Sequence, residues 1–254
     1  MKAVRAQSGL VTLLLALAAV SWWSTLERME GMDAGPWTAL GTLGWFLGLW
    51  IVMMAAMMLP SAIPAVALYA RLARERARLG SLLFVAGYLT VWAAAGLAAF
   101  GVAAVGSRVA GGMLAWDHAG RWAAGATLLI AACYQLTPLK DACLAKCRSP
   151  LGLLLGSWRP GAFGGFRLGL WSGAWCAACC WALMASLFAL GVMSIAWTAF
   201  VAAIVALEKI LPWRQVAMAT TTILLAALGL LLLAAPGGIP GLTLPGAAPM
   251  PMGG

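Results

Sequence analysis

Residues 173–184 read Gly-Ala-Trp-Cys-Ala-Ala-Cys-Cys-Trp-Ala-Leu-Met, in the middle of an apolar run from Leu168 to Leu190. A helix crosses the hydrocarbon core of a bilayer with about 20 apolar residues, so this run is predicted to be a transmembrane helix. On a helix, positions i, i+3 and i+4 share one face. Three thiols and a thioether are therefore expected on one stripe: Cys176, Cys179, Cys180 and Met184.

The rest of the chain has the composition of a protein that crosses a membrane several times. Hydrophobic residues make up 64% of the 254 residues and charged residues only 9%, which leaves little material for a soluble domain. An all-α polytopic helix bundle is predicted over residues 1–235, followed by an irregular tail rich in Pro and Gly over residues 236–254. Seven spans are expected: Gly9–Leu26, Trp37–Leu59, Ser81–Val105, Trp122–Leu139, Leu168–Leu190, Met193–Leu207 and Val216–Ala235.

The distribution of Lys and Arg predicts the orientation of these spans. With the N-terminus in the cytoplasm, 13 of the 16 basic residues fall in cytoplasmic segments, and the exceptions are Arg28, Arg108 and Arg121. This positive-inside bias places the C-terminus outside and predicts a multi-pass protein of the inner (plasma) membrane. Because the anionic inner leaflet accounts for the net charge of +9, nucleic acid is not an expected partner.

Two further groups of sulfur atoms accompany the Cys stripe. Met53 and Met57 are stacked at i, i+4 just before Pro60 and Pro64, which are expected to break or kink the helix. Another pair one turn apart, Cys143 and Cys147, follows the fourth span at its cytoplasmic end. Thiolates and thioethers together favour Cu(I) over Mg, Ca or Mn, which prefer oxygen ligands. Free Cys and Met are also ordinary packing residues, so core packing is the competing interpretation.

Polar and small residues near these sulfurs are further candidates for functional or helix-packing roles. Glu208-Lys209 ends the sixth span and is either an interfacial anchor or, if Glu208 faces the bundle, a functional residue that pairs with Lys140 or Arg167. A stripe of small residues at four-residue intervals in and before the fifth span predicts a close helix-packing face. It comprises Gly161, Gly165, Gly169 and Gly173.

Several of these motifs together resemble a bacterial family of predicted metal-binding integral membrane proteins whose function is not assigned. They are Trp50 to Pro64, Tyr134 to Lys140 with Cys143 and Cys147, Cys176-x-x-Cys179-Cys180-Trp181, and Glu208-Lys209. The family pattern has His-Gly where this chain has Ser172-Gly173, so Ser172 stands where an imidazole ligand is expected. The single histidine, His118, is expected in an outer loop, away from the thiols. The resemblance implies a metal-handling membrane protein with altered metal binding.

Three functions remain open at this point. The first is a Cu(I) transporter, chaperone or assembly factor, in which Cys143 and Cys147 capture the ion, Cys176, Cys179 and Cys180 form the buried site, and Met53, Met57 and Met184 supplement it. The second is an accessory or structural subunit of a larger membrane complex, or a homo-oligomer, which the glycine stripe favours. The third is a membrane thiol–disulfide oxidoreductase. A hydrolytic site or a phosphate-binding loop is not evident, so an ordinary soluble-substrate enzyme is not expected.

Overall fold

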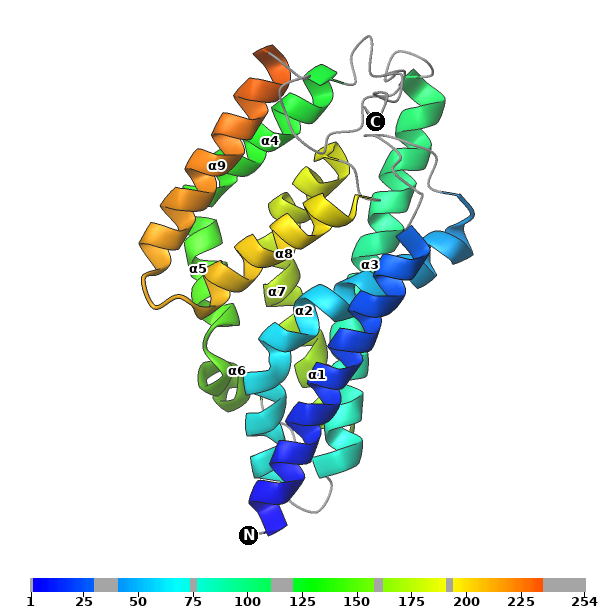
Figure 1. Ribbon diagram of the computed structural model, residues 1–254. Helices are drawn as coiled ribbons and strands as arrows, with labels where there is room; N and C mark the ends of the chain where they lie inside the picture. Colours follow the sequence, from blue (N-terminus) through cyan, green and yellow to red (C-terminus); the bar gives the residue numbers. More distant parts are fainter. Residues whose placement is uncertain are drawn as a thin grey trace, which may run out of the picture.

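The computed structural model describes residues 2–29, 41–73, 77–110, 121–157, 162–190 and 194–234, in which all the regular structure is helical. This confirms the all-α class. Along these segments the helices form an elongated bundle (Figure 1). They are α1 (Lys2–Met29), α2 (Leu43–Ala73), α3 (Ala77–Ala110), α4 (Arg121–Gln135), α5 (Pro138–Cys147), α6 (Pro150–Ser157), α7 (Ala162–Leu190), α8 (Ile195–Ile210) and α9 (Arg214–Ala234).

Among the described residues, the number of helices suited to cross a membrane is four or five, not the seven expected. Each expected span overlaps at least one helix, but in the described segments only four helices are both long and apolar enough: Leu43–Ala73, Arg78–Gly106, Phe163–Phe188 and Arg214–Ala234. A fifth span is formed if α4 and α5, which are bent by 71° at a short break, count as one. The apolar part of α1 is short, and α8 has 16 residues. The membrane topology stays a prediction.

Helix α7 is the element around which the site is built. It contacts α3, α4, α5, α6 and α8, and its glycines allow α3 to approach closely. A Cβ atom added to Gly169 would overlap the carbonyl group of Phe84 on α3, and one added to Gly165 would overlap the carbonyl oxygen of Gly80. Gly173 lies against Tyr88 in the same way. Backbones can approach this closely only where the side chain is absent, and the contact brings Tyr88 beside the Cys stripe.

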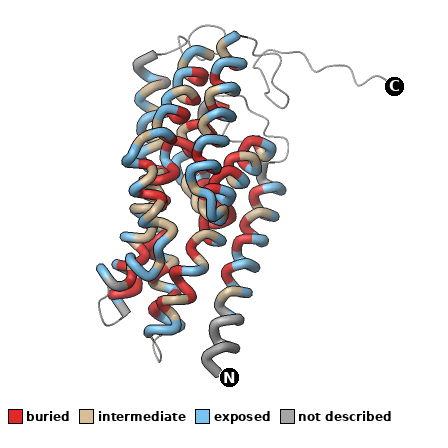
Figure 2. The backbone as a smooth tube through the Cα atoms, turned by 90° about the vertical axis from the view of Figure 1, so that its left-hand side faces the viewer, coloured by how far each residue is buried: buried red, intermediate tan, exposed pale blue. Residues whose placement is uncertain are grey.

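Helix α2 continues through its two prolines, so of the expected break or kink the break does not occur. It is helical from Leu43 to Ala73 and includes Pro60 and Pro64. Between them, the Ser61 hydroxyl donates a hydrogen bond to the Met58 carbonyl oxygen at 2.7 Å. The residues around the first proline therefore stay in helical register, and Met58 is completely buried. Figure 2 shows how buried residues run along the inner sides of the helices.

The corner between α4 and α5 directs α5 toward α7. Thr137 is extended (φ −78°, ψ 145°) and caps α5 by accepting a hydrogen bond from the backbone N–H of Lys140, while Pro138 begins the helix. Proline at the first helical position and threonine at the N-cap are both favourable for helix initiation. The hydroxyl of Thr137 also donates to the Tyr134 carbonyl oxygen at 2.7 Å. As a result α5 packs against α7 and buries Lys140 and Cys143.

Candidate metal centre

Four thiols from two helices meet inside the bundle. Cys176, Cys179 and Cys180 of α7 are each about 1% exposed, and the Sγ atoms of Cys179 and Cys180 are 3.3 Å apart. Cys147, at the end of α5, is close enough to Cys176 and Cys179 for these thiols to interact electrostatically. All six cysteines of the chain are free thiols. The α7 stripe and the second residue of the Cys143/Cys147 pair thus form one cluster, which we call the thiol cluster.

Cys176 is the most highly connected thiol of this cluster. Its Sγ atom accepts a hydrogen bond from the Tyr88 hydroxyl at 2.9 Å and one from the Lys209 ammonium at 3.0 Å. The Sδ atom of Met58 lies 4.0 Å away. Helices α2, α3, α7 and α8 therefore each contribute a side chain to the surroundings of this one sulfur atom.

Lys209 points into the bundle. Besides Cys176, its Nζ atom lies 3.0 Å from the Ser61 hydroxyl and 3.8 Å from the Met58 Sδ atom. The interpretation of Lys209 as an interfacial anchor is not what the structure shows, since its ammonium group lies among sulfur and oxygen atoms.

Glu208, the preceding residue, belongs to a separate buried cluster. Its carboxylate forms an ion pair with Lys140 at 2.7 Å, and both side chains are 2% exposed or less. Gln135 donates a further hydrogen bond to Glu208 at 2.7 Å, and Lys140 also donates to the Cys179 carbonyl oxygen at 2.6 Å. This polar network joins α4, α5, α7 and α8 and reaches the thiol cluster through the Cys179 carbonyl. The Glu208–Lys140 pair was one of the two anticipated from the sequence.

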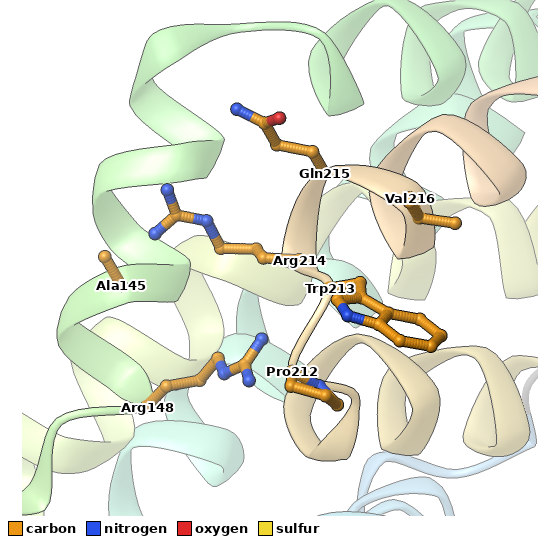
Figure 3. Close-up of a pocket in the computed structure, with 7 residues that line it drawn as sticks. All are labelled: Ala145, Arg148, Pro212, Trp213, Arg214, Gln215 and Val216. Carbon is orange, nitrogen blue, oxygen red and sulfur yellow. The ribbon is translucent and has the colours of Figure 1, made fainter.

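An open pocket of about 590 Å³ lies where α5 meets the junction of α8 and α9 (Figure 3). The Arg148 guanidinium donates to the carbonyl oxygens of Glu208 at 3.2 Å and Leu211 at 2.7 Å, and Arg214 pairs with Asp141 at 2.8 Å. The lining contains no sulfur atom: Ala145, Arg148, Pro212, Trp213, Arg214, Gln215 and Val216. The pocket therefore lacks the donors of the thiol cluster, and we assign it no metal.

Several other candidate residues take no part in the hydrogen bonds of the thiol cluster. Four of them are buried in the core: Met53, Met57, Met184 and Cys143. Met58, one residue beyond Met57, supplies the nearby thioether instead. Ser172 is half-buried, one turn before Cys176. Gly161, His118 and the tail from residue 236 lie outside the described residues.

Two contributors to the cluster, Tyr88 and Met58, were not among the candidate residues chosen from the sequence. The sequence does carry a signal for Met58, because Met54 and Met58 form a second i, i+4 pair on an adjacent face of the helix. Tyr88 has no such signal, since its role depends on how closely α3 approaches α7 along the glycines.

The donor set fits a soft monovalent ion. Across the described segments, no group of three or more Cys, His, Asp and Glu side chains is already arranged as metal ligands. Cu(I), however, accepts coordination by a pair of sulfur atoms, and thiolates with a thioether are the ligand types that select it. The thiols now make hydrogen bonds to one another, to Tyr88 and to Lys209, and these bonds would be exchanged for metal–sulfur bonds.

Comparison with known proteins identifies a family. The family model described as "PpoB2: Copper chaperone" matches residues 47–232, well over half of the chain. The matched region contains Met58, the four thiols of the cluster and Lys209. No curated protein and no solved structure matches the chain.

Proposed function

This chain belongs to the PpoB2 copper chaperone family, and on that premise we propose that it is a membrane-embedded chaperone that holds Cu(I) in the thiol cluster and passes it to an acceptor. Copper is the cargo of this activity. The observation that carries the proposal is the meeting of three buried thiols, one half-buried thiol and one thioether from three helices, α2, α5 and α7. Within the chain as described, the oxygen atoms hydrogen-bonded to these sulfurs are the Tyr88 hydroxyl and the Cys176 carbonyl, and no carboxylate of the kind that hard cations prefer is bonded to them.

The number of sulfur atoms suits transfer as well as storage. Cu(I) needs fewer sulfur ligands than the five that the cluster offers, so one ligand can be released while another binds. Cys147 is less buried than the three thiols of α7 and comes from a short helix of 10 residues. We therefore assign Cys147 to the entry and exit of the ion, with Cys176, Cys179 and Cys180 as the inner site.

The proposed membrane location is supported by the four or five helices that are apolar and long enough to span a bilayer. The large apolar side chains that remain exposed on these helices would contact lipid, as expected where the surrounding solvent is hydrocarbon. Membrane burial would keep water away from the cluster and slow the exchange of the ion with solvent.

The test is the copper content of the protein, purified in detergent under reducing conditions and loaded with Cu(I). Near-stoichiometric copper is expected for the wild type and none for Cys176/Cys179/Cys180→Ser. Copper retained by that variant would show that the inner site is wrongly placed. A wild type without copper would contradict the proposal. Disulfide-paired thiols would then indicate the oxidoreductase alternative, and a co-purifying subunit the accessory one.

A further inference from the structure

Lys209 is a half-buried cation whose ammonium group points inward and has no carboxylate partner among the described residues. In the part of the chain that the structure describes, the two ion pairs are Lys140–Glu208 and Arg214–Asp141. Lys209 is in neither of them, and the hydrogen-bond partners of its ammonium among these residues are Cys176, Ser61 and Met58. A charge held among thiols and apolar residues is costly unless something opposes it. The neighbouring Glu208 cannot supply the opposing charge, because Lys140 already neutralises it.

A copper-loaded cluster would carry a negative charge, which could oppose the positive charge of Lys209. When two thiols bind one Cu(I), two S–H bonds break, two protons leave to solvent and two Cu–S bonds form, without any redox change. Binding adds one positive charge and removes two. The two thiols, which are neutral before binding, therefore become a complex with a net charge of −1. An anionic complex in a low-dielectric interior needs a fixed cation nearby. Lys209, 3.0 Å from the Cys176 sulfur, stands where that cation is needed.

We propose that Lys209 is the fixed counter-ion of the Cu(I) bis-thiolate, so that the cluster and Lys209 together are neutral when one monovalent ion is bound. This inference rests on the proposed function, since it assumes that the cargo binds at Cys176. Ser61 and Met58 hold the ammonium in place through their contacts with Nζ. Lys209 is thus a positioning residue that favours a complex of charge −1.

The test compares two thiophilic ions of different charge. Cu(I) on two thiolates gives a complex of charge −1, whereas Hg(II) on two thiolates gives a neutral complex that gains nothing from a counter-ion. Lys209→Leu is expected to weaken Cu(I) binding by roughly tenfold to a hundredfold and to leave Hg(II) binding almost unchanged. Lys209→Arg keeps the charge and should retain most of the Cu(I) affinity. The Cu(I) affinity is measured in detergent by competition with a Cu(I) chelator, and the Hg(II) affinity by competition with a small dithiol.

Lys146→Leu is the matched control, because Lys146 is a lysine of the same region whose ammonium lies over the Trp175 ring at 4.3 Å. It should bind both ions like the wild type. Equal losses of Cu(I) and Hg(II) in Lys209→Leu would mean that Lys209 only supports the fold, and unchanged Cu(I) affinity would mean that it is not a counter-ion. Either result overturns the inference and leaves the proposed function standing. A wild type that binds Hg(II) but no Cu(I) overturns both.

Discussion

At the scale of single residues, Glu208 and Lys209 show how adjacent side chains can serve different clusters. Successive positions on a helix point about 100° apart, so Glu208 reaches Lys140 whereas Lys209 reaches Cys176. The sequence could place this pair at the end of a span, but it could not say which side chain faces which neighbour. That depends on how α8 is rotated against α5 and α7.

The positions of some sulfur atoms could likewise be predicted from the sequence, whereas those of others could not. The spacing of Cys176, Cys179 and Cys180 was sufficient to predict that they converge, because all three lie on one helix. The choice between Met57 and Met58 was not predictable, since both faces of α2 are buried and carry methionines. Periodicity marks a face only when the opposite face is polar.

Cys147 and Cys143 provide a direct comparison at this scale. We expect Cys147→Ser to lower Cu(I) affinity by about tenfold or more, because its thiol lies close enough to Cys176 and Cys179 to interact with both. Cys143→Ser should leave the affinity close to that of the wild type, since the Cys143 thiol is not among the groups that act on those thiols. Chelator competition on both variants measures this. Equal effects of the two substitutions would contradict the arrangement of the cluster.

At the scale of helices, the close contact of α3 and α7 positions Tyr88 beside Cys176. A stripe of glycines was recognisable in the sequence, but its partner helix was not, because a small-residue face is equally suited to an intramolecular or an intermolecular contact. The bend between α4 and α5 was also outside the prediction, which treated Trp122–Leu139 as one straight span. The structural reason is the Thr137-Pro138 cap, which begins a new helix.

Gly169→Ala tests the helix contact. The added methyl group would overlap the Phe84 backbone, and overpacking of this kind costs roughly 1–3 kcal/mol. Gly48→Ala is the control, because a Cβ atom there meets nothing within 4 Å and alanine is the better helix former by about 0.5–1 kcal/mol. Thermal unfolding in detergent should therefore rank Gly169→Ala below the wild type and Gly48→Ala at or above it. The reverse order would rule out a close α3–α7 contact.

The buried ion pair between α5 and α8 leads to a second prediction about stability. Lys140→Met leaves the Glu208 carboxylate buried without its partner, and breaking a buried pair in this way costs about 3–5 kcal/mol. The double variant Lys140→Met/Glu208→Leu removes both charges and should recover a large part of that loss. Denaturant or thermal unfolding of the two variants in detergent measures the difference. If the double variant were less stable than the single one, the pair would not be the source of the loss.

At the scale of the whole molecule, composition was sufficient to predict an all-helical bundle, but not the number of spans. Apolar segments of the expected length can form a straight helix, a broken one such as α4 and α5, or a short one such as α8. Hydropathy does not distinguish these, because all of them bury apolar side chains. The difference comes from caps and packing partners that are distant in the sequence.

The orientation of the molecule is a prediction at this scale. The excess of Lys and Arg in alternate loops predicts the N-terminus and the α2–α3 connection in the cytoplasm. Reporter fusions after residue 75 and after residue 115 should therefore be active on opposite sides of the membrane, the first inside and the second outside. Activity of both on one side would contradict the proposed topology.

The central claim is that sulfur atoms alone hold Cu(I) inside this bundle. X-ray absorption at the copper edge of the Cu(I)-loaded protein tests it most directly, because the technique reports the elements bound to the metal. We expect a monovalent copper edge with a first shell of sulfur only, and loss of that signal in Cys176/Cys179/Cys180→Ser. A first shell of nitrogen or oxygen, or a sulfur shell that survives in the variant, would contradict the account.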